Sequence, residues 1–220
     1  MSGCRYIFFD VGNTLLFPNR AKMLAPLAVE KHPTLAEWQA RERETKKEFD
    51  QSMLRGRVDH GFWRVFYTRL LDQLEEHDGM CDALVRNTQN SANWETILPG
   101  TREALCRIGQ NYRLAVISNS DGGIARILDR SGIADCFESI TDSGNLGIEK
   151  PRPEIFQAAL QAMKAAPEES LYVGDVYAVD YVGATNAGMQ AVLFDVCGAY
   201  AELDVPRVES LAQLEIWLKQ

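Results

Sequence analysis

The sequence YIFFDVGNTLLFP (residues 6–18) places an unbroken apolar run directly before a carboxylate, Asp10. A short aromatic and β-branched run is typical of a buried strand, here covering residues 5–9, and Gly12 with Asn13 forms a turn signal behind it. A carboxylate at the end of such a strand either supports the turn through local hydrogen bonds or takes part in chemistry. The rest of the sequence decides between these two roles.

Composition indicates one globular domain, or one domain with a modest insertion. The chain has 220 residues, of which 46% are hydrophobic and 25% charged, the ordinary mixture for a folded soluble protein. The formal net charge of −8 provides no overall attraction for nucleic acid or for an anionic membrane surface. We therefore expect neither as a partner, and a phosphate-bearing ligand would need a local cluster of donors.

Cysteine use and hydropathy favour a cytoplasmic protein. The five cysteines are scattered without CxxC spacing, which disfavours a zinc site and a disulfide framework. No stretch approaches the ~20 apolar residues that a membrane-spanning helix needs. The apolar run before Asp10 also lacks the cleavage site of a signal peptide. The sequence is compatible with a monomer or a homodimer.

The pattern changes between about Asn19 and Trp94, where apolar residues recur at helical spacing and no strand-like run occurs. Residues 34–54 predict one long, highly charged helix, and Thr34 with Glu37 supplies a capping box at its start. Charged helices of this kind usually turn most of their side chains to solvent. We therefore expect a helical insertion whose charges are mainly exposed.

Beyond residue 98, short apolar runs alternate with helical patterns. Strands are predicted at residues 112–120, 136–141, 170–175 and 189–195, and helices at residues 102–111, 122–132, 152–163, 179–188 and 210–219. This alternation implies right-handed crossovers and a parallel sheet covered on both faces. The predicted fold is α/β, a Rossmann-like doubly wound parallel sheet of residues 1–18 and 95–220, with residues 19–94 inserted after the first strand.

Polar residues stand at or just beyond the carboxyl ends of the predicted strands. They are Asp10, Ser118, Asn119, Lys150, Asp175 and Asp180. In parallel α/β sheets ligands bind beyond these ends, so the topology would gather the residues in one place. Asp10 or Asp175 taken singly is most simply a turn or cap residue, but capping does not also explain Lys150 and Ser118. Asp180 fits metal support or a structural contact equally well, and Asp121 fits a helix cap.

Four motifs in this order resemble the haloacid dehalogenase-like (HAD) hydrolase superfamily. They are DVGNTL (residues 10–15), ISNSDG (117–122), GIEKPRPEIF (147–156) and VGDVYAVDYVGATNAGM (173–189). The resemblance covers the whole chain, and residues 19–94 resemble the C1-type cap domain of subfamily I. It implies a hydrolase, specifically a phosphatase with Mg²⁺ as cofactor and a small phosphorylated molecule as substrate.

The resemblance also implies roles for the strand-end residues. Asp10 would be the nucleophile that attacks phosphorus and forms an aspartyl-phosphate. Asp10, Asp175 and the backbone carbonyl of Gly12 would hold Mg²⁺, whose preferred ligands are oxygen atoms.

Four further residues would support this chemistry. Lys150 would contact the nucleophile and the phosphoryl oxygens, while Ser118 and Asn119 would bind the transferring group. Thr14 would steady the catalytic loop by hydrogen bonding. Asp180 would orient Lys150 or a metal-bound water from outside the metal's own ligands.

The sequence departs from the family pattern at Gly12, where phosphatases usually carry a second Asp that protonates the leaving group. Three interpretations follow. The protein is a phosphatase weakened toward ordinary monoesters, or one that borrows an acid from the cap or the substrate. Alternatively, it is a 2-haloacid dehalogenase, whose halide leaving group needs no proton, or a non-catalytic binding or regulatory protein that keeps the fold. Asp175 favours phosphoryl chemistry, because dehalogenases lack a metal-binding carboxylate in the fourth motif.

The sequence gives little indication of which residues of the insertion would face a substrate. The candidates are Arg20, Arg41, Arg55, Arg57, His60 and Trp63. For each of them a structural role is the simpler expectation, because charged helices are commonly solvated and tryptophan is commonly core.

Overall fold

A computed structural model of the protein describes residues 3–56, 61–74 and 79–220. At its centre is a parallel sheet of strand order β5-β4-β1-β6-β7-β8. The strands are β1 (Tyr6–Phe9), β4 (Arg113–Ser118), β5 (Ser139–Asp142), β6 (Ser170–Gly174), β7 (Gln190–Phe194) and β8 (Arg207–Val208). The order reverses direction about β1, which confirms the predicted Rossmann-like α/β class.

Helices cover both faces of the sheet because alternate side chains of β1 enter two apolar clusters. Ile7 and Phe9 pack with α5, α6 and α10, whereas Tyr6 and Phe8 pack with α8 and α9 on the opposite face. The bounds of these helices are α5 (Thr101–Ile108), α6 (Ile124–Arg130), α8 (Pro153–Met163), α9 (Val182–Asn186) and α10 (Leu211–Trp217). Every side chain of β1 is therefore buried, as the unbroken apolar run predicts.

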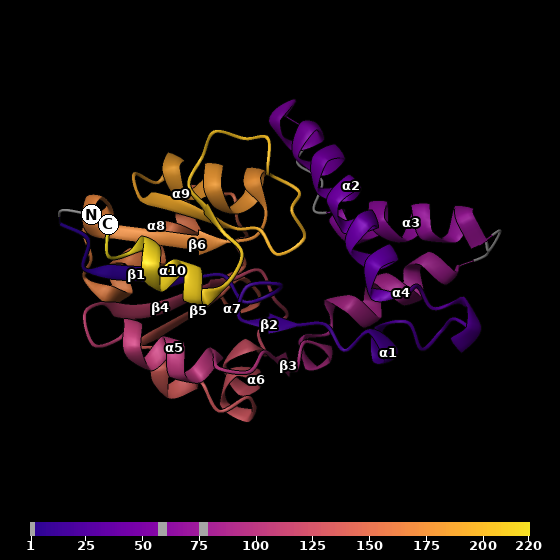
Figure 1. Ribbon diagram of the computed structural model, residues 1–220, viewed down its shortest axis with the longest axis horizontal. Helices are drawn as coiled ribbons and strands as arrows, with labels where there is room; N and C mark the ends of the chain where they lie inside the picture. Colours follow the sequence, from indigo (N-terminus) through magenta and orange to yellow (C-terminus); the bar gives the residue numbers. More distant parts are fainter. Residues whose placement is uncertain (1–2, 57–60, 75–78) are drawn as a thin grey trace.

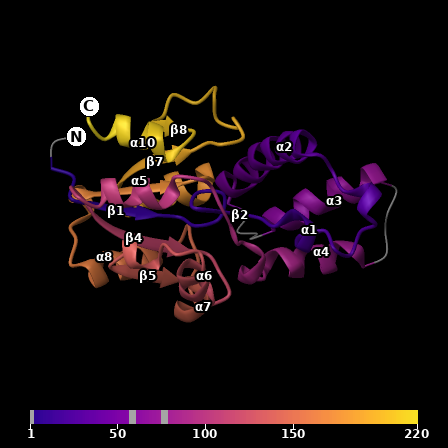
Figure 2. The ribbon, with the colours of Figure 1, turned by 60° about the horizontal axis from the view of Figure 1, so that its bottom comes forward.

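The segment between β2 and β3 is helical and lies to one side of the sheet (Figures 1 and 2). Its helices are α1 (Arg20–Met23), α2 (Leu35–Leu54), α3 (Phe62–Leu74) and α4 (Met80–Gln89). Helices α2, α3 and α4 share an apolar cluster with two leucines that follow α1, and it includes Trp38, Phe66 and Leu70. The strands β2 (Leu16–Phe17) and β3 (Thr96–Ile97) pair antiparallel where the chain enters and leaves this segment.

The predicted capping box at the start of α2 is confirmed. The Thr34 hydroxyl accepts from the Glu37 backbone N–H at 3.3 Å, and the Glu37 carboxylate accepts from the Thr34 N–H at 2.8 Å. The expectation that the charges of α2 are mainly exposed is wrong for one face. Glu42, Lys46 and Asp50 are buried there, because their four-residue spacing aligns them toward the polar ends of the sheet strands.

Several element boundaries differ from the prediction. Residues 179–188 do not form one helix, because a π-helical turn, η5 (Tyr177–Tyr181), precedes α9. The strand predicted at residues 136–141 begins at Ser139, after a 3₁₀ turn. The two-residue strands β2, β3 and β8 and the short helix α7 (Ser143–Leu146) were not predicted, since elements this short show no periodicity.

Short 3₁₀ turns complete the chain: η1 (Val29–Lys31), η2 (Ser91–Asn93), η3 (Ala134–Cys136) and η4 (Pro167–Glu169). All five cysteines have free thiols, as their spacing predicts. Within the described parts of the chain, none of the helices combines the length and the apolar character that crossing a bilayer demands.

Candidate active site

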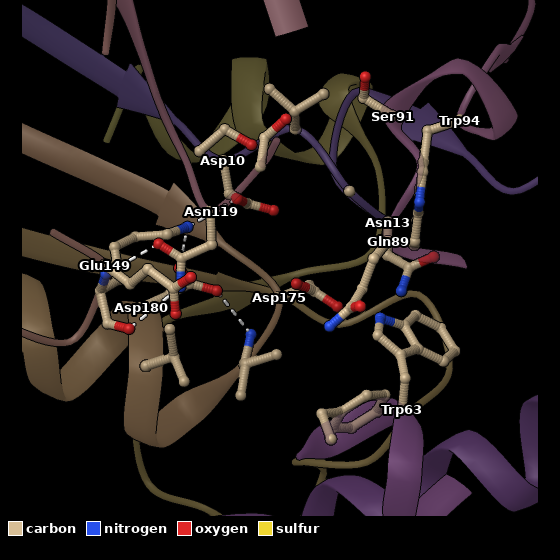
Figure 3. Close-up of a pocket in the computed structure, with 18 of the residues that line it drawn as sticks. Asp10, Asn13, Trp63, Gln89, Ser91, Trp94, Asn119, Glu149, Asp175 and Asp180 are labelled. Carbon is tan, nitrogen blue, oxygen red and sulfur yellow. Dashed lines mark hydrogen bonds and ion pairs between the residues drawn. The ribbon is translucent and has the colours of Figure 1, made fainter. Parts of the chain in front are cut away.

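A cavity of about 440 Å³ opens where β1, β4 and β6 end, facing the helices of the insertion (Figure 3). The predicted site residues that line it are Asp10, Gly12, Ser118, Asn119, Lys150, Asp175 and Asp180. They come from four separate segments, as the strand-end argument predicts. Thr14 is the one predicted site residue that does not line this cavity.

Lys150 forms the charged centre of the site. Its Nζ lies 2.6 Å from Asp10 Oδ1, 2.8 Å from Asp180 Oδ1 and 2.8 Å from the Tyr172 hydroxyl, so each ammonium hydrogen has an acceptor. The side chain is 2% exposed. Burial alone would lower the Lys150 pKa, but Asp10 and Asp180 outweigh it and raise the pKa. Lys150 is therefore cationic at any physiological pH.

Asp180 is fixed by contacts that support the orienting role predicted for it. Its second oxygen accepts from the Val176 N–H at 2.9 Å, which leaves Oδ1 directed at Lys150. Gly174 permits this approach, because a Cβ there would lie 2.5 Å from Asp180 Cγ. Tyr172, which sequence reasoning missed, donates to the Ile117 carbonyl at 3.1 Å and contacts Lys150 through the same hydroxyl.

Asn119 contacts the chain at Lys150. Its Oδ1 accepts from the Lys150 N–H at 2.8 Å, and its Nδ2 donates to the Lys150 carbonyl at 3.0 Å. The amide thus positions the lysine loop through its oxygen and one Nδ2 hydrogen, and Asn119 also lines the cavity. Ser118 is buried at the end of β4 and lines the cavity.

The hydrogen bonding predicted for Thr14 comes from the backbone, where the Thr14 N–H donates to the Val11 carbonyl at 3.3 Å, and not from the side chain. Its hydroxyl is buried and has no partner among the residues that the structure describes. The loop is held instead by backbone bonds, with the N–H groups of Leu15 and Leu16 both 2.9 Å from the Val11 carbonyl. The sequence could not distinguish these two ways of closing the same turn.

Three buried carboxylates meet in the cavity. Asp10, Asp175 and Asp180 each place an oxygen within 4.8 Å of the others. Burial raises the pKa of Asp10 to about 7; Lys150 opposes the shift, and the other two carboxylates add to it. Burial also raises the pKa of Asp175 to about 6. Crowded oxygen donors that resist ionisation fit a hard divalent cation, which would relieve their repulsion.

A second buried lysine, Lys46 on α2, reaches this cluster from the insertion. Its Nζ lies 2.7 Å from Asp175 Oδ2 and 3.2 Å from Glu42 Oε1. The same Glu42 oxygen accepts from Asn13 Nδ2 at 3.2 Å. Burial would lower the Lys46 pKa, but Asp175 and Glu42 raise it well above its ordinary value. Sequence reasoning missed Lys46 and Glu42, although their spacing with Asp50 marks one helix face.

Asp50 joins α2 to the core at a second point. Its Oδ1 accepts from the Ala178 N–H at 2.9 Å and its Oδ2 from the Tyr200 hydroxyl at 2.8 Å. Nearby, Arg43 Nη1 donates to the Cys197 carbonyl at 2.9 Å. Burial raises the pKa of Asp50 to about 6, although both donors lower it. One face of α2 is therefore bonded to the loops that follow β6 and β7.

The substrate-facing candidates of the insertion occupy different environments. Trp63 lines the cavity, whereas Arg41 is buried beside Gln73 and Arg55 is exposed. Arg20 is not among the lining residues. Arg57 and His60 lie outside the described residues.

The N-cap of α6 is Gly123, without a side-chain cap bond, so Asp121 does not have the capping role predicted for it. Its Oδ1 accepts from the Gly123 N–H at 3.0 Å, and its Oδ2 accepts from the Ser91 N–H at 3.1 Å. The next helical N–H, that of Ile124, goes to Asp142 instead. Asp121 therefore links the start of α6 to the segment that follows α4.

Comparison with known proteins gives one family. A family model described as haloacid dehalogenase-like hydrolase matches residues 4–188. Glyceraldehyde 3-phosphate phosphatase of Methanothermobacter thermautotrophicus is 38% identical over 130 residues, covering 53% of this chain and 56% of the relative. Haloacid dehalogenase-like hydrolase domain-containing protein 3 of Xenopus laevis is 32% identical over 59% of this chain and 54% of the relative. The matches span about half the length of these curated relatives.

Solved structures share the whole fold at low identity. A HAD-hydrolase of Bacillus subtilis, YfnB, whose crystal contained magnesium, has a TM-score of 0.72 and 19% identity, with 99% of each chain covered. L-2-haloacid dehalogenase from Xanthobacter autotrophicus has a TM-score of 0.62 and 18% identity, with 98% of each chain covered. At such identities the likeness establishes the fold alone, so activity has to be argued from the site.

Proposed function

Because this chain belongs to the haloacid dehalogenase-like hydrolase family, we propose that it is a Mg²⁺-dependent phosphatase that acts on a small phosphorylated molecule. The observation that carries the proposal is the buried group of Asp10, Asp175 and Asp180, whose oxygens lie within 4.8 Å of one another. The buried ammonium groups of Lys150 and Lys46 offset part of this negative charge, and a divalent cation would offset the rest. Phosphoryl transfer uses such a cation, whereas displacement of a halide does not. Relatives named as phosphatases support the same choice.

Asp10 is the nucleophile in this mechanism. Lys150 donates to its Oδ1, which leaves the other carboxylate oxygen to attack phosphorus. As the Asp10–phosphorus bond forms, the bond from phosphorus to the leaving oxygen breaks, and its electron pair leaves with that oxygen. Water then attacks phosphorus and the aspartyl-phosphate bond breaks. This step regenerates the Asp10 carboxylate and releases inorganic phosphate.

The surrounding residues bind and orient the reacting groups. Asp10, Asp175 and the Gly12 carbonyl would hold Mg²⁺, which would neutralise charge on the phosphoryl oxygens. Lys150 holds the nucleophile by donating to Asp10 Oδ1, and Asp180 fixes the position of the ammonium group. Ser118 lines the same cavity and would donate to a phosphoryl oxygen.

The helical insertion would act as the cap. We propose the boundaries predicted from sequence, with residues 19–94 as cap and residues 1–18 and 95–220 as core. The separate apolar cluster of α2, α3 and α4 supports this division. A cytoplasmic location and the choice between monomer and homodimer stay predictions.

A substrate screen tests the proposal. Phosphorylated metabolites and 2-haloacids would each be incubated with the protein, with and without Mg²⁺, and with Asp10→Asn as the control. We expect phosphate release that requires both Mg²⁺ and Asp10. Halide release independent of Mg²⁺ would instead establish a dehalogenase. A protein that releases neither product, and does not bind beryllium fluoride at Asp10, would be a non-catalytic member of the family.

A further inference from the structure

Trp94 occupies the space in which a side chain at position 12 would lie. A Cβ on Gly12 would be 3.2 Å from Trp94 Cζ3 and 3.5 Å from two further atoms of the same ring. Gly12 is not among the residues with positive φ, so backbone conformation does not require a glycine there. A larger residue there would press on the indole ring, which would have to shift by a few tenths of an ångström.

The ring is held in place before any ligand binds. Trp94 Nε1 donates to the Thr88 carbonyl at 2.7 Å, and the ring meets Trp63 edge to face, with 5.7 Å between centroids. Trp63 in turn packs against Phe62 and Phe66 at 5.0 and 5.4 Å. An aromatic surface fixed in this way loses little conformational entropy when a ligand contacts it.

The cavity has two chemically different sides. Trp63 and Trp94 lie away from Asp180 and Glu149 (Figure 3), and Phe49 also lines the aromatic side. Within the described chain, the lining residues between positions 19 and 95 are all uncharged: Phe49, Phe62, Trp63, Thr88, Gln89, Ser91 and Trp94. A leaving group bound against them would meet planar apolar surface, a few neutral polar groups and, beside Ser91, the Asp121 carboxylate.

We infer that Trp94, Trp63 and the bare Gly12 form a subsite for an aromatic leaving group, so that the substrates are aryl phosphates. The inference rests on the proposed phosphatase function. When Asp10 binds phosphorus, the phosphorus–oxygen bond to the ring breaks and the electron pair leaves as an aryloxide, which solvent protonates. An aryloxide is a stable anion, so its departure needs no general acid. The indole that packs against position 12 would thus bind a leaving group that departs without an acid at that position.

Binding of phosphonates tests the subsite without turnover, because their carbon–phosphorus bond is not hydrolysed by this chemistry. Calorimetry in Mg²⁺ would compare phenylphosphonate, cyclohexylphosphonate and methylphosphonate. We expect phenylphosphonate to bind about tenfold tighter than methylphosphonate, as one well-packed aromatic contact provides, and tighter than the cyclohexyl compound. Equal affinities of the wild type for the three would overturn the inference without any variant.

Variants assign the preference to the indole. Trp94→Leu should lose most of the phenyl preference and keep methylphosphonate affinity within about twofold, while Trp94→Phe should retain part of the preference. Trp217→Leu, on α10 and away from the cavity, is the matched control and should behave as wild type. If Trp94→Leu fails to fold, Trp63→Leu carries the same expectation. A full phenyl preference in a folded Trp94→Leu protein would overturn the assignment.

Turnover separates this inference from the function on which it rests. Mg²⁺-dependent hydrolysis combined with equal affinities for the three phosphonates would support the phosphatase function and contradict the aromatic subsite. A phenyl preference without hydrolysis of phenyl phosphate or of any other phosphate ester would support the aromatic ligand site and contradict the phosphatase function. Preferential binding of phenylphosphonate together with hydrolysis of phenyl phosphate would support both.

Discussion

Lys46 Nζ on α2 lies 2.7 Å from Asp175 Oδ2, just beyond the end of β6. The lysine is 1% exposed, and its second partner, Glu42, also accepts from Asn13 in the catalytic loop. One buried ammonium therefore joins the helical insertion to a carboxylate proposed to bind metal. Among the ion pairs of the described chain, neither carboxylate contacts another lysine.

Removing this lysine should destabilise the metal-free protein. Lys46→Met keeps most of the side-chain volume but leaves Asp175 and Glu42 buried without their cation, and breaking a buried pair in this way costs about 3–5 kcal/mol. Urea unfolding in a chelator would measure the loss, and Mg²⁺ should restore part of it at Asp175. Lys47→Met changes an exposed neighbour and should stay within about 0.5 kcal/mol of wild type. Coincident unfolding curves for Lys46→Met and wild type would contradict the structural role.

Asp10→Asn should leave a folded, inactive protein. Lys150 retains Asp180 and Tyr172 as partners, so the fold loses one ion pair and no packing. The amide cannot form the aspartyl-phosphate, and we expect at least about a 10³-fold loss of kcat. Steady-state rates together with circular dichroism would check this. Asp135→Asn, at an exposed ion pair with Arg102, should remain active. Near wild-type rates for Asp10→Asn would exclude Asp10 as the nucleophile.

Mg²⁺ should stabilise the wild type through Asp175. A ligand bound only by the folded state contributes about 2.7 kcal/mol at one hundred times its Kd. Thermal melts with increasing Mg²⁺ should therefore shift upward for the wild type and for Asp204→Asn, an exposed control. Asp175→Asn, which preserves the shape of the side chain, should lose most of the shift. Identical Mg²⁺ responses in all three proteins would place the metal elsewhere.

Restoring an acid at position 12 should require a smaller residue at position 94. Gly12→Asp alone forces its Cβ against the Trp94 ring, 3.2 Å away, and such overpacking typically costs about 1–3 kcal/mol. In Gly12→Asp combined with Trp94→Ala, the carboxyl has room to protonate an alkoxide. Alkyl phosphates should then react up to about 10²-fold faster than with Trp94→Ala alone.

Burst kinetics with an alkyl and an aryl phosphate would measure both effects. The double variant should also shorten the lifetime of the aspartyl-phosphate, since the new carboxylate would activate water. A Gly12→Asp protein as stable as wild type, or a double variant with no gain on alkyl phosphates, would show that Trp94 does not control this position.

Asp50 should make the protein less stable as the pH rises. Its pKa increases from an ordinary 3.8 to about 6 in the folded state. The folded protein therefore holds this proton more tightly than the unfolded chain, and stability decreases between about pH 4 and pH 6 by up to about 3 kcal/mol.

Asp50→Asn should flatten this part of the stability curve. The amide oxygen can still accept from the Ala178 N–H, and its NH₂ group can donate to the Tyr200 hydroxyl. Asp10 and Asp175 shift in the same direction in both proteins, so the difference between the two curves isolates Asp50. Melting temperatures from pH 4 to pH 7 would measure it, and parallel curves would contradict the assignment.

The local pattern of the chain is enough to predict the sheet and one half of the site. An apolar strand that is buried on both faces ends where the sequence becomes polar. Parallel topology brings the carboxyl ends of such strands together at one edge of the sheet. Asp10, Lys150 and Asp175 can therefore be grouped from the alternation of strands and helices along the chain. Gly12 can also be recognised as a missing acid, because its place in the motif depends only on sequence position.

The other half of the site depends on how distant segments pack. From sequence alone, Lys46 resembles any solvent-exposed lysine of a charged helix, and only the structure shows its contact with Asp175. Trp94 likewise resembles an ordinary core residue, and only the structure shows that its ring packs against Gly12. Periodicity determines which face of a helix a residue occupies, but it carries no information on what that face will meet. The partner is decided by the placement of the helical insertion against the strand ends, which is a property of the tertiary structure alone.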